Sequence, residues 1–177
     1  MIVFDFCNTL VPFNTSQKYF EMASKNVLIR MVILVRKFLS KFKFYIEERQ
    51  LLFAIKICFP KLHSKSVKLV GQDIQKHFKH RILQSVLKES LQGEKIILCT
   101  ATFLDFLPTD YLSQYFDQII ASRRIINSGE QKARNILPLL NHGEKITFVS
   151  DSLTEDFAMF LISHKCYYVR NEDLYEI

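Results

Sequence analysis

Two carboxylates, a hydroxyl and an ammonium group lie beside apolar runs of the sequence. Asp5 follows the apolar residues Met1 to Phe4, Thr100 ends the run IILCT, and Asp151 ends KITFVSD. Lys132 lies in the stretch SGEQKARNI. Gathered at one place, these side chains would bind a charged ligand and neutralise its charge, as an enzyme site does. Whether they meet depends on the elements that carry them.

The hydrophobic pattern predicts those elements. Short apolar runs indicate strands, and helical segments between them indicate parallel βαβ units. Because the runs are almost continuously apolar, we expect helices on both faces of the sheet. The predicted strands are Met1–Phe4, Lys95–Thr100, Asp117–Ser122, Lys145–Asp151 and Cys166–Arg170. The predicted helices between the later strands are Thr109–Phe116, Gly129–Leu140 (bent or ended by Pro138) and Glu155–His164.

In an open α/β sheet, ligands bind beyond the carboxyl ends of the strands. Asp5, Thr100 and Asp151 fall at such ends, so we expect them at one edge with Lys132 nearby. Singly, each has a simpler explanation. Asp5 or Asp151 could cap a helix, Thr100 could be structural, and Lys132 could be a solvated helix residue. Their joint placement, in this order, is much harder to obtain by chance.

The region between the first two predicted strands is helical. Asn14-Thr-Ser16 is a cluster of helix-capping residues, and apolar residues recur at helical spacing after it. A further stretch, Glu47 to Phe59, is stopped by Pro60, and another continues from Ser66 to about Gln92. We therefore expect an α/β, Rossmann-like parallel sheet core with an inserted all-helical cap. The core would comprise residues 1–13 and 93–177, and the cap residues 14–92.

The same two regions of the chain differ in net charge. Residues 14–88 contain 16 Lys and Arg against four Asp and Glu, whereas the rest of the chain contains 8 against 14. The Lys and Arg of the cap could be solvated residues of helices whose apolar faces pack together. Alternatively, they could draw the protein to an anionic substrate or to an anionic membrane surface, with Arg30, Lys37 and Lys41 on one stripe. No nucleic-acid recognition motif accompanies the charge, so we expect no nucleic-acid partner.

The composition fits one folded domain, or one core domain with a small insert. Of the 177 residues, 49% are hydrophobic, including 16 Phe, which is enough apolar mass for a core. The four cysteines include no CxxC pair, so neither a zinc site nor a redox motif is indicated. We expect no signal peptide and no transmembrane span, since there is no basic leader and no run of roughly 18 uncharged apolar residues. A cytoplasmic location is the corresponding expectation.

The stretches described above, in this order, resemble the haloacid dehalogenase (HAD) superfamily of phosphohydrolases over nearly the whole chain. The first motif of that family is a hydrophobic strand followed by D-x-D-x-T, and here it reads VFDFCNTL. The later motifs correspond to IILCT, SGEQKARNI and VSDSLTED, and the helical insertion matches the family's cap. The SGEQK and SDS…DFAM stretches look most like the phosphoserine-phosphatase branch, in which some members act on phosphatidylglycerophosphate.

The resemblance implies an Mg²⁺-dependent phosphohydrolase. Phosphoryl transfer needs positioning and charge neutralisation, and Asp5 would be the catalytic nucleophile that forms an aspartyl-phosphate. Mg²⁺ needs oxygen ligands and usually keeps several waters. Its protein ligands would be Asp5, the backbone carbonyl of Cys7 and Asp151. Asp156 would support the metal, with Glu155 as the alternative.

The remaining motif residues would bind the phosphate of a small phosphorylated substrate, a class that includes lipid-linked phosphates. Thr100 would hydrogen-bond a phosphate oxygen. Lys132 would be catalytic, pairing with the nucleophile and with the transferring group. Asn8 and Thr9 would surround the phosphate in the loop after the nucleophile. Asn8 replaces the usual Gly of the family, and Asn tolerates left-handed backbone angles.

Cys7 departs from the family's pattern. In phosphatase members, an Asp at this position protonates the leaving oxygen and then deprotonates the attacking water. A thiol, with a free pKa near ~8.5, is a poor proton donor there, and general acid–base catalysis contributes roughly 10²–10⁴-fold. The alternative is therefore a degenerate HAD-like domain that binds metal or phosphate without efficient turnover. In a third interpretation, the protein cleaves a bond other than a phosphate ester. Family members that cleave carbon–halogen or carbon–phosphorus bonds also lack this Asp.

Overall fold

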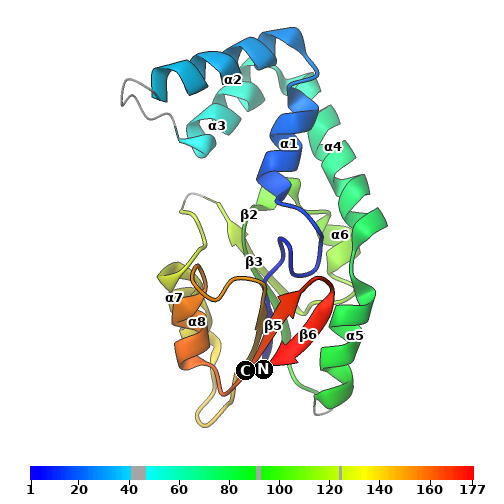
Figure 1. Ribbon diagram of the computed structural model, residues 1–177, viewed down its shortest axis with the longest axis vertical. Coiled ribbons are helices and arrows are strands. Elements are labelled where there is room, and N and C mark those ends of the chain that lie inside the picture. Colours follow the sequence, from blue (N-terminus) through cyan, green and yellow to red (C-terminus); the bar gives the residue numbers. More distant parts are fainter. Residues whose placement is uncertain (41–46, 91–92, 124) are drawn as a thin grey trace.

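Six strands form one sheet in the computed structural model, which describes residues 1–40, 47–90, 93–123 and 125–177. The strands follow the order β3-β2-β1-β4-β5-β6 across the sheet (Figure 1). β1 to β5 run parallel, whereas β6 pairs with β5 in the antiparallel direction. The strands are β1 (Ile2–Phe4), β2 (Ile96–Phe103), β3 (Gln118–Ser122), β4 (Thr147–Ser150), β5 (Lys165–Arg170) and β6 (Asp173–Glu176). The predicted α/β fold with a parallel sheet is confirmed.

Helices cover both faces of this sheet, as the apolar runs predict. Side chains alternate along β1, so Ile2 and Phe4 belong to one buried cluster and Val3 belongs to the other. Helices α5 and α6 contribute to the first cluster, and α7 and α8 contribute to the second (Figure 1). These helices are α5 (His80–Glu89), α6 (Thr109–Leu112), α7 (Glu130–Ile136) and α8 (Phe157–Ile162).

Between β1 and β2, all regular elements of the described residues are helices, as expected for an all-helical insertion. The side chain of Asn14 accepts a hydrogen bond from the Gln17 N–H at 3.0 Å, so the predicted capping cluster does begin a helix. Across the described residues, no helix combines the length and the apolar character needed to cross a membrane. Before α5, the insertion contains α1 (Thr15–Ala23), α2 (Val27–Ser40), α3 (Glu48–Cys58) and α4 (Pro60–His77).

Several predicted bounds are wrong. Pro60 does follow the end of α3, but it also begins α4, because a proline at the first helical position gives up no hydrogen bond. The helix predicted for residues 129–140 is α7 followed by a 3₁₀ turn, Leu137–Leu139, around Pro138. α6 and α8 are shorter than predicted. β6 was not predicted, since its mostly exposed residues lack an apolar pattern.

The last helix of the insertion packs on the sheet. Ile82, Leu83 and Val86 of α5 are buried in the same cluster as Ile2 and Phe4 of β1. The predicted division into a core and a cap with a boundary after residue 92 stays a prediction. Because α5 packs on the sheet, we group it with the core. We therefore use the word cap for α1 to α4.

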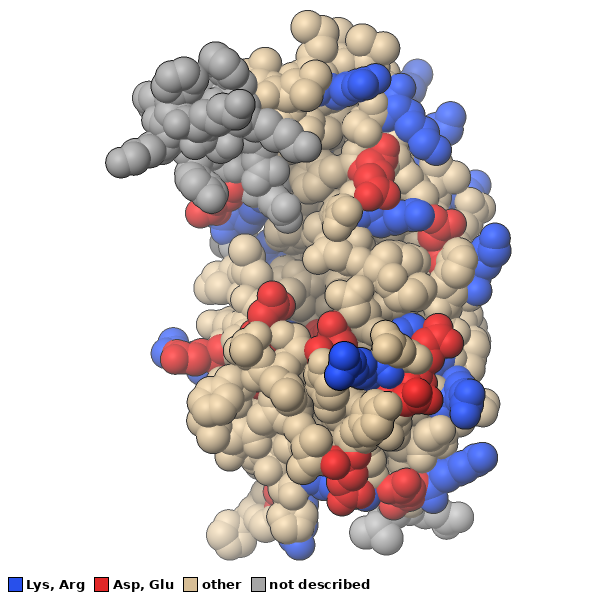
Figure 2. Space-filling model, viewed as in Figure 1, with Lys and Arg blue, Asp and Glu red and all other residues tan. Residues whose placement is uncertain are grey.

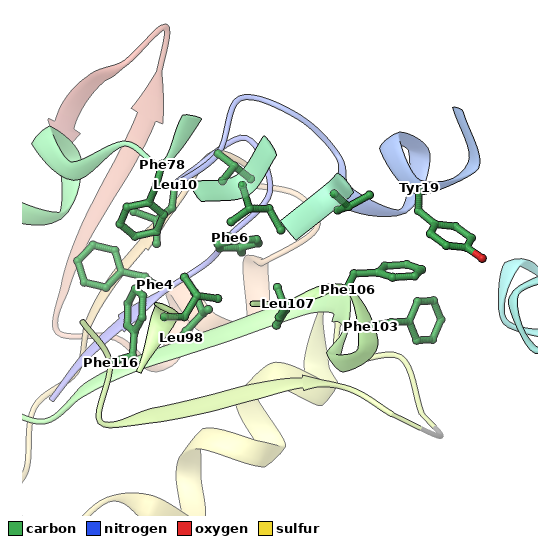
Figure 3. Close-up of a cluster of buried hydrophobic side chains, with 14 of the residues drawn as sticks. Phe4, Phe6, Leu10, Tyr19, Phe78, Leu98, Phe103, Phe106, Leu107 and Phe116 are labelled. Carbon is green, nitrogen blue, oxygen red and sulfur yellow. The ribbon is translucent and has the colours of Figure 1, made fainter. Parts of the chain in front are cut away.

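Aromatic side chains join the cap to the core. Tyr19 of α1 stacks on Phe106, which lies in a 3₁₀ turn after β2, with ring centroids 4.6 Å apart. The Tyr19 hydroxyl is hydrogen-bonded to Nδ1 of His63 in α4 at 2.9 Å. Figure 3 shows the buried cluster extending from Phe4 and Phe116 at the sheet to Tyr19. Burial of these rings holds the cap above the carboxyl edge of the sheet.

Replacement of Leu83 by Ala should lower the free energy of unfolding by about 2–5 kcal/mol, because truncation at this buried position leaves a cavity in the core. Leu34→Ala makes the same chemical change on α2 at a residue that is 55% exposed, and it should change stability by no more than about 0.5 kcal/mol. Urea denaturation of both variants measures the difference. Equal effects would contradict the assignment of α5 to the core.

Candidate active site

A cavity of about 270 Å³ opens at the carboxyl edge of the sheet, under the cap. Its walls come from the segments that follow β1 and β4, from β2, and from the start of α1. Asp5, Thr100, Lys132 and Asp151 all line this cavity. The structure thus brings together the four groups that the sequence places beside apolar runs.

The simpler explanations of the charged residues do not hold. Asn14, rather than Asp5, caps the first helix of the chain. The helix after Asp151 begins only at Phe157, so Asp151 does not cap it. Lys132 is 3% exposed and is therefore not a solvated helix residue.

The Lys132 ammonium group lies between two buried carboxylates. Its Nζ donates to Oδ1 of Asp5 at 2.6 Å, and it contacts Oδ1 and Oδ2 of Asp156 at 2.6 and 2.8 Å. All three side chains are at least nine-tenths buried, so little water competes for these contacts. They come from the end of β1, from α7, and from the loop before α8. Removal of one member would leave an uncompensated buried charge, which is costly.

Burial and charge oppose each other in this ion triad. Desolvation raises the pKa of the Asp5 carboxyl to about 6 against the opposing charge of Lys132, and the Asp156 charge adds to the increase. Burial by itself would lower the pKa of Lys132, but the charges of Asp5 and Asp156 outweigh it and raise that pKa above its ordinary value. Lys132 is therefore cationic at neutral pH. The Asp5 carboxyl, because of its raised pKa, is protonated more easily than an ordinary aspartate.

Thr9 links Asp5 to the second predicted metal ligand. Its Oγ1 donates to Oδ1 of Asp151 at 3.0 Å and lies 3.4 Å from Oδ2 of Asp5. The same oxygen accepts a hydrogen bond from the Asp151 N–H at 3.0 Å. Thr9 is fully buried, and its side chain is not part of the cavity wall. Its hydroxyl therefore fixes the spacing of the two carboxylates, and the predicted phosphate contact of Thr9 stays a prediction.

The geometry separates the two candidates for the supporting acidic residue. Asp156 contacts Lys132, and its Oδ2 also accepts a hydrogen bond from the Ser150 hydroxyl at 2.7 Å. Glu155 is exposed at the cavity and has no such contact with Lys132. Both oxygens of Asp156 thus have protein partners, so its contacts suit the positioning of Lys132. Its predicted role as a metal ligand stays a prediction.

Cys7 belongs to a hydroxyl network that the sequence analysis missed. Sγ of Cys7 lies 3.1 Å from Oγ1 of Thr102 and 3.4 Å from Oγ1 of Thr15, and these two hydroxyl oxygens are 2.7 Å apart. Oγ1 of Thr100 accepts a hydrogen bond from the Thr102 N–H at 3.1 Å. The network therefore joins α1 of the cap to β2 beside the nucleophile position. Neither threonine carries a distinguishing sequence signal, since Thr15 belongs to a helix-capping cluster and Thr102 lies inside the mostly apolar strand β2.

Two residues with positive φ shape the backbone at the site. Asn8 has a φ of 58°, a left-handed conformation that Asn tolerates, and it lines the cavity. Gly129, just before α7, has a φ of 53°. A Cβ at Gly129 would lie 3.4 Å from the carbonyl oxygen of Glu155. Gly129 thus allows α7 to begin close to the loop that follows β4, which brings Lys132 to its carboxylate partners.

The charges at the cavity favour binding of a metal cation. Among the described residues that line it, Lys132 is the one cation, against the carboxylates of Asp5, Asp151, Glu155 and Asp156. No group of three or more His, Cys, Asp or Glu in the described part of the chain is arranged to hold a metal alone. The carboxylates of Asp5 and Asp151 nevertheless suit Mg²⁺, which completes its shell with backbone oxygens and water. The donor set therefore fits the predicted ion.

Comparison with known proteins bears on the fold. Neither the protein-family models nor the curated proteins include a match to this sequence. Among solved structures, a protein of unknown function from Bordetella pertussis Tohama I matches with a TM-score of 0.68 and 15% identity, over 94% of this chain and 87% of that one. A HAD family hydrolase from Salmonella enterica subsp. enterica serovar Typhi matches with a TM-score of 0.51 and 10% identity, over 92% of this chain and 59% of that one.

This chain has the HAD-like fold. At such low identities the likeness concerns the fold alone, so the activity must be argued from the site. The assignment to the phosphoserine-phosphatase branch stays a prediction. Asp5, Thr100, Lys132 and Asp151 nevertheless match the residue types that the motifs mark, whereas Cys7 and Asn8 depart from them.

Replacement of Lys132 by Met should lower the free energy of unfolding by about 3–5 kcal/mol at pH 7.5, because Asp5 and Asp156 lose their counter-charge. The pKa of Asp5, raised by burial to about 6, should then rise further. Protonated carboxyls tolerate burial, so the loss should shrink as the pH falls through this raised pKa toward 4. Chemical denaturation at several pH values with a chelator measures this.

Lys61→Met, at an exposed position of α4, is the matched control and should have little effect at any pH. A loss of stability in Lys132→Met that does not depend on pH would contradict the ion triad.

Proposed function

We propose that this HAD-like protein is an Mg²⁺-dependent phosphohydrolase that acts through an aspartyl-phosphate on a small phosphorylated substrate. The observation that carries the proposal is the contact of Lys132 with Asp5 and Asp156 at the wall of a cavity that Asp151 also lines. Buried charges are costly, so a purely structural domain gains little from such a triad beside an open cavity. A phosphohydrolase needs it to orient a nucleophile.

In the proposed reaction, a carboxylate oxygen of Asp5 attacks phosphorus, the bond to the ester oxygen breaks, and the leaving oxygen takes up a proton. Water then attacks the aspartyl-phosphate, which releases inorganic phosphate and restores the Asp5 carboxylate. Lys132 keeps Asp5 oriented and favours its ionised form, and its charge also offsets that of the transferring group. Thr100, on the cavity wall, would hydrogen-bond a phosphate oxygen.

The excess of carboxylates supports the metal dependence. A phosphate dianion would meet net negative charge in this cavity if protein groups alone lined it. Mg²⁺ held by Asp5, Asp151 and the Cys7 carbonyl would supply the missing positive charge and offset the charge of the phosphate oxygens. Asp5 and Asp151 are already brought together by Thr9, so little rearrangement is needed before they share an ion.

A second cavity, of about 520 Å³, supports a place for the leaving group. Phe103 belongs to the walls of both cavities, so the two adjoin. The second cavity is lined by Leu52 and Phe53 of α3, by Arg123, and by Lys56, which pairs with Asp105 of the same wall at 2.7 Å. These walls suit a leaving group with an apolar part and an anionic part. Lipid-linked phosphates belong to that class, and we include them in the proposed substrate range.

Cys7 sets the expected leaving-group preference. Burial raises the pKa of the Cys7 thiol, and the charge of Asp5 raises it further. The thiol is therefore protonated at neutral pH, and its loss of a proton would place a thiolate beside a carboxylate. Cleavage should be slow for esters whose leaving oxygen needs a full proton and faster for leaving groups of low pKa. Binding of metal or phosphate without efficient turnover is the second candidate function, and Cys7 is the feature that favours it.

Replacement of Cys7 by Asp should raise kcat/KM for alkyl phosphates, by up to about 10²–10⁴-fold, because it adds the missing general acid. Aryl and acyl phosphates should gain much less, since their leaving groups depart without a full proton. Initial rates across esters of graded leaving-group pKa measure the effect. The assay must contain saturating Mg²⁺, because a second carboxylate beside Asp5 raises the pKa values of both when no metal is present.

Two variants serve as controls. Cys7→Ser keeps the size of the side chain without adding an acid, so it should not show the gain. Asp5→Asn removes the nucleophile and should abolish turnover of every ester. Equal, metal-independent activity in the wild type, Cys7→Asp and Asp5→Asn would place catalysis elsewhere. No turnover in the wild type or in Cys7→Asp, with Mg²⁺ and phosphate still bound, would favour the second candidate function.

A further inference from the structure

Helix α2 turns an apolar face toward solvent. Ile29 is fully buried and Ile33 is half-buried, so these residues, four positions apart, mark the side of α2 that packs against the rest of the protein. The other side consists of apolar residues that are 42–70% exposed. We call them the α2 apolar face; they are Val27, Leu28, Met31, Val32, Leu34 and Val35.

This face is continuous around the helix. Successive residues are about 100° apart, so the six positions fill a single arc opposite Ile29 and Ile33. In most surface helices this arc is polar, and the apolar stripe is the buried one. An isolated exposed apolar residue needs no explanation, but a contiguous set of this size marks an interaction surface. In Figure 2, the described residues at the end of the molecule where Figure 1 places α2 are mostly tan.

Two exposed cations flank the α2 apolar face. Lys25 precedes α2, and Arg30 lies at the border of the arc; both are exposed. Arg30 is also part of the predicted basic stripe, but Lys41 lies outside the described residues, as does the side chain of Lys37. Figure 2 shows further Lys and Arg atoms beside the tan end. Exposed cations of α4, in the same cap, are Lys61, Lys65 and Lys68.

An anionic lipid surface complements both properties. Its acyl chains accept apolar side chains, and its headgroups carry the charge opposite to that of residues 14–88, with 16 Lys and Arg against four Asp and Glu. A second copy of this chain would cover the apolar side chains equally well. It would also bring two strongly cationic regions together, which charge repulsion disfavours.

The length of α2 decides how it would lie on such a surface. The helix has 14 residues, which span about 21 Å, whereas the hydrocarbon core of a bilayer is about 30 Å thick. α2 therefore cannot cross a bilayer, and its one-sided exposure matches a helix that lies in the plane of the interface.

We propose that the α2 apolar face docks the protein on an anionic lipid bilayer, at the boundary between headgroups and acyl chains. Lys25 and Arg30 contact the headgroups, and the exposed lysines of α4 add to the attraction toward the anionic surface. This docking requires neither a metal nor turnover. Its failure and the failure of the proposed hydrolase activity are therefore separate outcomes.

Co-sedimentation of the full chain with lipid vesicles tests the proposal. The wild type should bind vesicles that contain phosphatidylglycerol at low salt, bind phosphatidylcholine vesicles much less, and dissociate as the salt rises, since the Debye length falls to about 3 Å at 1 M. The double variant Leu28→Gln/Leu34→Gln should bind the anionic vesicles at least about tenfold more weakly, because two apolar insertions are lost. Both residues are exposed, so the fold should persist.

Leu137→Gln/Leu161→Gln is the matched control. It makes the same two changes at exposed leucines outside the cap, and its vesicle binding should stay within about twofold of the wild type. A second measurement uses the absence of Trp from the chain. Val32→Trp places the sole indole on the α2 apolar face, where its emission should shift to the blue on binding and be quenched by brominated acyl chains. Leu161→Trp should show neither effect.

Three results would overturn the proposal. The first is no binding to anionic vesicles at low salt, or equal binding to both kinds of vesicle at every salt concentration. The second is an equal loss of binding in the α2 pair and in the control pair. The third is a wild-type dimer, seen by sedimentation equilibrium, together with no binding of the wild type to vesicles. The Leu28→Gln/Leu34→Gln variant would abolish this dimer. That result would assign the face to a second copy of the chain.

Discussion

The Lys132 ammonium can remain buried only while the carboxylates of Asp5 and Asp156 stay in contact with it. The fold around Lys132 holds these two carboxylates in place. The three residues lie just after β1, in α7 and in the loop before α8, so segments far apart in the chain must meet with little freedom. Parallel pairing of β1 with β4 brings Asp5 near the loop that carries Asp156. Gly129 then allows α7 to begin close to that loop. A shift of any one segment would leave a charge buried without its partner.

The same triad leaves the cavity short of positive charge. One ammonium group cannot offset the carboxylates around it, and desolvation already raises the pKa of Asp5 to about 6. Thr9 keeps Asp151 near Asp5 through one hydroxyl, and the charge of Asp156 adds to the increase in the pKa of Asp5. The protein thus maintains an electrostatically unfavourable arrangement that a divalent cation would relieve. This is the physical basis for the proposed metal, independent of any resemblance to other proteins.

Much of this arrangement could be predicted from the sequence, because it depends on strand ends. The apolar runs before Asp5 and Asp151 place both residues at one sheet edge once the strands are parallel, and the structure agrees. The contacts of Thr15 and Thr102 with Cys7 could not be predicted. They depend on how the cap sits on β2, and threonines in a capping cluster or in a strand look the same with or without such contacts.

The contacts that helices make with the rest of the protein could not be predicted from the sequence either. Periodicity predicts that α2 is a helix with apolar positions, but it cannot say which side of the helix the rest of the cap covers. Ile29 and Ile33 occupy that side, so the remaining apolar residues face outward. The packing of α5 on the sheet was equally hidden, because a helix that follows a cap has the same apolar stripe whether it packs on the cap or on the core. In each case the local pattern fixes the element, and tertiary contacts fix its partner.

The charge asymmetry of the sequence has a role in both proposals. The cavity carries an excess of carboxylates, which by themselves repel anions, whereas the cap above it is rich in Lys and Arg. An anionic ester or an anionic lipid surface is therefore attracted first by the cap, over distances of about a Debye length. Only a group that reaches the cavity meets Asp5 and Lys132, where the proposed cation would offset the charge of the carboxylates. Attraction to the protein and access to Asp5 thus depend on different residues. The two proposals can be tested separately because these residues lie in separate regions of the sequence.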